Sequence, residues 1–270
     1  MKYQPSLPER NDNIAHEHPL KEFALITSAL VAIAVLVFWL LGLAVDAVVD
    51  RISPETEAML NKMAAAGVES TSQEALPREA QLQVLIDDLR QCAGLVTPAT
   101  VRLIESTSPN AAVIPGGTVL VNSGLLEHVK SQNGLSFVLA HELAHLAHRD
   151  HLRAMGRGIV LFGISVALTG STSDISQLLM PVHEVAQSSY SRTRESAADA
   201  RALQILHCRY GHAGGATELF ESLKKNDEDT FAASHYVASH PSMQARIDAL
   251  QRAIVRGELK AGPVLPLFDH

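Results

Sequence analysis

The stretch His141-Glu142-Leu143-Ala144-His145 decides how the rest of this 270-residue chain is interpreted. Apolar residues recur at helical spacing from Leu135 to Leu146, so the stretch is predicted to lie within a helix. Because histidines four positions apart project from one face of a helix, His141 and His145 can share one cation. Glu142 is beside the first of them, within reach of a water bound to that cation. The pattern therefore predicts a hydrolytic metal site.

Zinc is the metal that this pattern favours. A zinc-bound water has a pKa of about 7, and a nearby carboxylate can take its proton while the hydroxide attacks a polarised carbonyl. The chain has 13 histidines and only two cysteines, and two thiolates cannot build a four-cysteine zinc site. We therefore expect one Zn²⁺ per chain, held by histidines and carboxylates, with Glu142 as the general base.

The first candidate for a third ligand is a histidine beyond the motif. His151 stands at the position where a metzincin has its third histidine. The metzincin pattern also requires a glycine between the second and third histidines, where the helix breaks, and this chain has His148 there. We therefore expect His148 and His151 to be solvated residues near the end of the helix, where cations are tolerated.

The second and better candidate is Glu195, within the stretch Ser191–Asp199. Ser191 can cap a helix on which Glu195 and Asp199 share one face. Two carboxylates so placed can have separate roles, since Glu195 can bind zinc while Asp199 holds a ligand histidine by its other ring nitrogen. The alternative is an exposed helix face with surface ion pairs, but the alanines between the two carboxylates favour close approach of a second helix.

Towards the amino end, one long apolar stretch predicts a membrane anchor. Residues 23–45 contain no charged side chain, and as a helix they would extend about 34 Å, enough to cross a hydrocarbon core. A cleaved signal peptide is the alternative, but its apolar region would be about 7–15 residues long. Basic residues are slightly more numerous before the span than after it, which favours a cytoplasmic tail over residues 1–22 and an exported body.

The remaining chain is predicted to be a helical linker over residues 46–77 and a folded domain over residues 78–270. Short strands are expected at 100–105, 110–114 and 118–122, with turn residues between the last two. Helical patterns precede and follow these strands. The expected fold class is therefore α+β, mainly helical with a small β-sheet and preceded by one transmembrane helix.

Three further features give expectations. The apolar stretch 159–169 is about 11 residues long and too short to span a membrane, so we expect a buried or membrane-resting helix. Cys92 and Cys208 each lie near the end of a predicted helix and are either joined or buried as free thiols. The formal net charge of −7, without clustered basic residues, argues against nucleic acid as a partner.

Taken together, these segments resemble the gluzincin-type zinc metallopeptidases that include the HtpX heat-shock protease and the CAAX prenyl protease. The resemblance covers roughly residues 78–256. It rests on four ordered segments: Asn110–Gly117 followed by Gly124-Leu125-Leu126, His141–His145, Ser191–Asp199, and His240-Pro241 followed by Arg246-Ile247.

The resemblance implies a zincin-like domain in which His141, His145 and Glu195 are zinc ligands. It also implies that Glu142 is the catalytic base and that Asp199 supports a ligand. Membrane-embedded members have several spans, whereas this chain has one credible span, so prenylated substrates are not implied.

The pattern fits better with single-anchor members of the bacterial inner membrane whose catalytic domain stands in the periplasm and degrades misfolded envelope proteins. Unfolded or misfolded proteins and the inner membrane are the expected partners. The alternative is a zinc-stabilised chaperone or binding protein with little turnover.

Substrate contact is expected along the predicted strand Asn110, Ala111, Ala112, Val113 and Ile114. An extended peptide can add to such a strand through backbone hydrogen bonds, although a buried central strand is the alternative. His240 is expected to have a catalytic role as a donor to the developing oxyanion. It can instead ligate the open zinc position and keep the enzyme latent, or be a capping or surface residue at the start of a helix.

Overall fold

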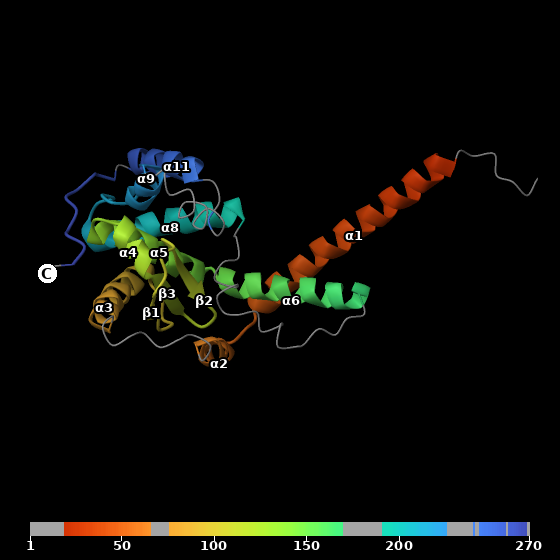
Figure 1. Cartoon of the computed structure of the whole chain (residues 1–270), viewed down its shortest axis with the longest axis horizontal. Helices are drawn as coiled ribbons and strands as arrows, with labels where there is room; N and C mark the ends of the chain where they lie inside the picture. The colour runs from red at the N-terminus through yellow and green to blue at the C-terminus, as the bar shows by residue number, and fades with distance from the viewer. Residues whose placement is uncertain are drawn as a thin grey trace, which may run out of the picture. The chain divides into compact units, whose positions relative to one another are not determined.

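The computed structural model describes residues 19–65, 76–169, 191–225, 240, 243–257 and 259–268. The chain divides into two units, Met1–Asp46 and Ala47–His270, and the second contains the predicted site. The described elements (Figure 1) are, in chain order, α1 (Pro19–Val49), α2 (Pro54–Ala65), α3 (Leu76–Ala93), β1 (Thr100–Ile104), β2 (Ala111–Ile114), β3 (Thr118–Asn122), α4 (Ser123–His128), α5 (Gln132–Ala147), α6 (Asp150–Thr169), α8 (Arg192–Tyr210), α9 (Glu218–Lys225) and α11 (Met243–Arg256). This arrangement confirms the α+β class, mainly helical with a small sheet.

Helix α1 contains the apolar stretch that was expected to anchor the chain. The most apolar window of Leu20–Val49 has a mean hydropathy of 2.7, and none of that window is buried. Within the described part of the chain, it is the one helix long and apolar enough to cross a membrane. The predicted apolar helix is therefore confirmed, and it extends beyond residues 23–45 at both ends.

A three-stranded sheet with the order β1-β3-β2 forms one layer of the body. Strand β1 is parallel to β3, and β2 is antiparallel to it. The turn from β2 to β3 passes through Gly116 and Gly117, whose φ angles are 89° and 95°. A side chain at Gly117 would come within 2.7 Å of the Pro98 carbonyl oxygen, so only glycine fits there. In the strand order β1-β3-β2, strand β2 lies at an edge of the sheet, although all four of its residues are buried.

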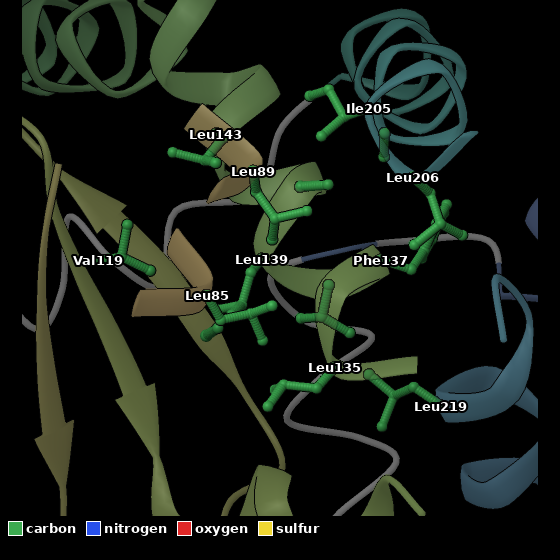
Figure 2. Packing of buried hydrophobic residues seen from close by; sticks show 14 of the residues in the cluster. Leu85, Leu89, Val119, Leu135, Phe137, Leu139, Leu143, Ile205, Leu206 and Leu219 are labelled. Atoms are coloured by element: carbon green, nitrogen blue, oxygen red, sulfur yellow. The ribbon is translucent and has the colours of Figure 1, made fainter. Parts of the chain in front are cut away.

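Helix α5 lies at the centre of the hydrophobic core. It packs against α3, α8 and β2, and Figure 2 shows apolar side chains of α3, α5, α8 and β3 converging. Every residue from Asn133 to Leu146 is buried, so this helix has no solvent-exposed polar face. Its apolar burial stabilises the fold by roughly 25 cal/mol per Å². The two histidines of α5 are buried along with it, which requires partners for their polar atoms.

The junction between α5 and α6 corrects the expectation for His151. Arg149 has a left-handed backbone with a φ of 54°, and α6 begins at the next residue. His151 is consequently turned inward, where it is 0% exposed and its Nε2 lies 3.6 Å from Glu57 Oε1 of α2. The prediction that His151 is solvated is therefore wrong, whereas His148 is exposed as expected.

The apolar stretch 159–169 forms the second half of α6. Ile159 is 49% exposed and Leu161 is 52% exposed, so the alternative of a buried helix is wrong for these residues. Phe162, Ile164 and Val166 are half-buried. The membrane-resting alternative is the one that stays open.

A disulfide bond joins Cys92 at the end of α3 to Cys208 near the end of α8. The two Cα atoms are 5.7 Å apart, and the bond spans a sequence separation of 116 residues. The alternative of two free thiols is therefore wrong. Because α3 and α8 both pack on α5, the bond holds together two helices that flank the predicted zinc helix.

Replacing both cysteines with alanine should lower the free energy of unfolding by about 2–4 kcal/mol, because the bond restricts the unfolded chain. Denaturant unfolding of the full-length protein in detergent micelles measures this difference. Wild-type protein treated with reductant is the matched control and should unfold at the midpoint of the double variant. Alkylation of both thiols in unfolded wild type without reductant would show that the bond does not form.

Candidate active site

Four buried side chains from three parts of the chain meet beside α5. His141 and His145 project from α5, Glu195 from the first turn of α8, and His240 from the segment before α11. Their potential ligand atoms all lie within 4.8 Å of one another. None of the four residues is more than 2% exposed. The structure therefore brings together all three predicted ligands and adds His240 to the same cluster.

The geometry within this cluster fits a metal ion. The Nε2 atoms of His141 and His145 lie 3.0 Å apart and face the Glu195 carboxylate, whose Oε1 is 3.3 Å from His145 Nε2. Glu195 Oε1 is buried and has no hydrogen-bond donor among the described residues. Two imidazole nitrogens and one carboxylate oxygen are a donor set found in catalytic zinc sites, which leave a fourth position for water or substrate.

The start of α8 positions Glu195 as the sequence predicts. The Ser191 side chain accepts a hydrogen bond from the Arg194 backbone N–H at 3.4 Å and so caps this helix. Glu195 is then in the first turn, and Asp199 follows one turn later on the same face. Both carboxylates point towards α5, with which α8 is closely packed.

Each histidine of the motif has a carboxylate on its other ring nitrogen. His141 Nδ1 lies 3.0 Å from Asp199 Oδ1, and His145 Nδ1 lies 2.9 Å from Asp150 Oδ2. Such contacts fix the tautomer and orientation of a ligand histidine. The contact of Asp199 was expected, but that of Asp150 was not. Asp150 lies beyond the end of α5, and only the left-handed turn at Arg149 brings it back to His145.

Arg246 on α11 is a buried cation. In the sequence it was noted only as part of the segment Arg246-Ile247, without a role of its own. It donates from Nε and Nη2 to the two oxygens of Asp199, at 2.8 Å and 2.6 Å. Its Nη1 lies 2.9 Å from Glu195 Oε2, and its guanidinium stacks 4.8 Å above the Phe220 ring. Arg246 therefore ties α11 to both carboxylates of α8. The signal for it in the sequence is an arginine among the apolar positions of an amphipathic helix.

The charges of the cluster follow from burial and these contacts. Burial alone would raise the pKa of Asp199, but hydrogen bonds with His141 and Arg246 lower it to about 2. Burial also opposes ionisation of Glu195, yet the three surrounding histidines hold its pKa well below its usual range. For His141, burial and Arg246 lower the pKa, while Asp199 and Glu195 outweigh them and raise it to about 9. Glu195 and Asp199 are thus both held in the ionised form, which is the form in which a carboxylate binds a metal or orients a ligand histidine.

Glu142 lies beside the cluster and is held by the edge strand of the sheet. Its Oε2 accepts a hydrogen bond from the Val113 backbone N–H at 3.2 Å. Val113 pairs with Val119, and the N–H groups of alternate residues in β2 point away from β3. The outward N–H at Val113 is therefore used to orient Glu142. The other oxygen, Oε1, lies 3.8 Å from His240 Nε2.

His240 contacts the cluster through both ring nitrogens. Its Nδ1 lies 3.0 Å from Glu195 Oε2, while its Nε2 faces Glu142. Burial lowers the pKa of His240, against the opposing effect of Glu195, so the neutral imidazole is favoured. The alternative of a surface residue is wrong, because His240 is 2% exposed.

Comparison with known proteins gives the family to which this geometry corresponds. Residues 77–254 match the sequence model of Peptidase family M48. The chain belongs to this family of metallopeptidases.

Three similar proteins illustrate the range of relatives. The chain is 29% identical to the mitochondrial metalloendopeptidase OMA1 of Schizosaccharomyces pombe, over 58% of this chain and 47% of that protein. It is 28% identical to the metalloprotease YcaL of Escherichia coli, over 60% of this chain and 65% of that protein. It is 32% identical to the protease HtpX of Legionella pneumophila, over 40% of this chain and 36% of that protein. The chain thus spans less than two thirds of the length of each of these relatives.

Replacing Arg246 with methionine should destabilise the protein by about 3–5 kcal/mol, because the buried carboxylates of Asp199 and Glu195 would lose their shared cationic partner. Thermal unfolding of the full-length protein, metal-free and metal-loaded, measures this effect. Arg252→Met is the matched control, since Arg252 is exposed on the same helix and should change stability little. Equal unfolding temperatures for the two variants would contradict the role assigned to Arg246.

Proposed function

We propose that this chain is a membrane-anchored zinc endopeptidase that hydrolyses peptide bonds in misfolded or damaged proteins of the bacterial envelope. The observation that carries the proposal is the convergence of His141, His145 and Glu195, with Glu142 adjacent to them. Membership of Peptidase family M48 supports a proteolytic role, and similar proteins are named as metalloendopeptidases or proteases. Zinc is proposed because the donor set is nitrogen- and oxygen-based and retains one position for substrate.

In the proposed reaction, His141, His145 and Glu195 would hold the zinc ion, while Asp199 and Asp150 keep the two imidazoles oriented. When bound, zinc would polarise the scissile carbonyl and make water a stronger acid. Glu142 takes a proton from the attacking water and delivers it to the leaving amine nitrogen. Its hydrogen bond from Val113 keeps one carboxylate oxygen in place, so the second oxygen is available for proton transfer.

The substrate is proposed to lie as an added strand along residues 110–114. This placement is supported by the position of β2 at the edge of the sheet and by the hydrogen bond between Val113 and Glu142. Because the Val113 N–H is already engaged, a peptide would pair with the remaining outward groups, namely the Ala111 N–H and C=O and the Val113 C=O. Backbone pairing reads little side-chain identity, which suits unfolded substrates.

For the whole chain, we propose a cytoplasmic tail at residues 1–22, an inner-membrane anchor at 23–45, a linker at 46–77 and a periplasmic catalytic domain at 78–270. The apolar character of α1 supports the anchor. The Cys92–Cys208 bond supports an oxidising compartment, where disulfides persist.

His240 is proposed to act as a fourth donor in the resting site rather than as an oxyanion donor. Its Nε2 lies 3.8 Å from Oε1 of the proposed base Glu142. An imidazole in this position would compete with water for the open zinc position and would have to move before catalysis. A site closed by four protein ligands also fits the zinc-stabilised chaperone, which is the second candidate function.

The Glu142→Gln variant should retain zinc and lose about 10²–10⁴-fold in the rate of casein hydrolysis, because it lacks the general base. The Glu195→Ala variant should be depleted of zinc. Both are measured on the full-length protein in nanodiscs, with metal content determined by atomic emission. Glu105→Gln removes an exposed carboxylate and is the control that should behave as wild type.

Hydrolysis by Glu142→Gln at the wild-type rate would refute the endopeptidase proposal. If wild type suppresses casein aggregation without cleavage, and Glu142→Gln does so equally, the chaperone candidate replaces it. Full zinc retention by Glu195→Ala would remove Glu195 from the ligand set.

The His240→Ala variant should retain zinc and show faster basal proteolysis and self-cleavage, because the competing donor is removed. Measurement of kcat and zinc content on the same preparation tests this. A fall in kcat of about 10²-fold with zinc retained would instead assign His240 to the oxyanion. Behaviour identical to wild type would leave His240 with a structural role only.

A further inference from the structure

The second half of α6 is an apolar surface that the proposed reaction does not use. The charged residues Asp150, Arg153 and Arg157 are all in the first half of the helix, and none occurs from residue 158 to residue 169. Ile159 and Leu161 are 49% and 52% exposed. A largely apolar helical segment without charged residues is found either in a protein core or in a membrane, and the exposure of Ile159 and Leu161 places these two residues outside the core.

The beginning of α6 is tied to the last residue of the apolar helix α1 and to the residues that directly follow it. Arg149 donates through Nη1 to the carbonyl oxygens of Val49 and Ile52, at 3.0 Å and 3.1 Å. Arg153, in the first turn of α6, pairs with Asp50. Val49 is the last residue of α1. The start of α6 therefore contacts residues 49–52, which follow the end of the proposed anchor at residue 45 by only a few positions.

We infer that the apolar half of α6 inserts into the outer leaflet of the membrane that holds α1, so that its partner is lipid. This inference rests on the proposed anchoring by α1. Residues 159–169 would extend roughly 16 Å as a helix, about half of a hydrocarbon core of about 30 Å, so the helix enters one leaflet and does not cross. The charged first half of α6 stays at the level of the headgroups, where arginine side chains are favourable.

Insertion of α6 has a consequence for the site, because this helix begins directly beyond the zinc helix. Asp150 is its first residue and contacts His145 Nδ1 at 2.9 Å. The membrane would therefore hold the helix that orients one metal ligand. The substrate class that fits this geometry is a polypeptide presented at the membrane surface.

Tryptophan fluorescence in vesicles of brominated phospholipid tests the inference on the full-length protein. The chain has one tryptophan, Trp39 in α1, which reports on the anchor in the wild type. In a Trp39→Phe background, Leu161→Trp places the reporter on α6. Val96→Trp places it at a site of the body that is 93% exposed and serves as the control. If Leu161→Trp does not fold, Phe162→Trp on the same half of α6 takes its place.

The expected result is that the tryptophan at position 161 is quenched most strongly by bromines about 5–10 Å below the headgroups, while that at position 96 is not quenched. Quenching of Trp39 together with no quenching at position 161 would overturn the inference and leave the anchor intact. No quenching of Trp39 would refute the proposed anchor, and the inference with it. If protection of the tryptophan at position 161 from quenching depends on the protein-to-lipid ratio, a second copy of the chain covers α6. This result would also overturn the inference.

Discussion

The ion pair between Arg246 and Asp199 is the interaction on which the candidate site depends. Four carboxyl groups and three histidines lie in an interior from which solvent is almost excluded, and buried charges are unfavourable unless they are compensated. Arg246 supplies a buried positive charge beside α5 and α8, and its fork of donors matches the Asp199 carboxylate. Asp199 in turn orients His141. The position of α11 is thus linked to the orientation of a metal ligand.

The hydrophobic core explains why this polar cluster is so well ordered. The buried leucines of α5 pack against α3, α8 and the sheet. Because α5 is packed on several sides, its rotation about its own axis is fixed. Fixing that rotation also fixes the direction of His141, Glu142 and His145. The disulfide between α3 and α8 connects the two helices on either side of α5. Packing and covalent linkage therefore stabilise the same three-helix unit.

Much of the site could be predicted because its decisive spacings are local. The histidine pair of α5, and Glu195 with Asp199 on α8, each lie on one helix, where a spacing of four residues fixes a shared face. The roles of Asp150 and the burial of His151 could not be predicted in this way. Both depend on the left-handed backbone of Arg149, which is uncommon for a residue other than glycine and leaves no mark in the pattern. The contact of Arg246 depends on how α11 docks, which is a tertiary property.

The hydrogen bond between the Val113 amide and Glu142 has a consequence for selectivity. The strand proposed to align the peptide is the same strand that positions the base Glu142. The peptide and the base would therefore both be positioned relative to the backbone of β2. A peptide that pairs with β2 would present its cleaved bond at a constant distance along the main chain, whatever side chains flank it. The register of pairing with β2 would then determine which peptide bond is cleaved. Selectivity among substrates would depend on which chains are unfolded enough to pair.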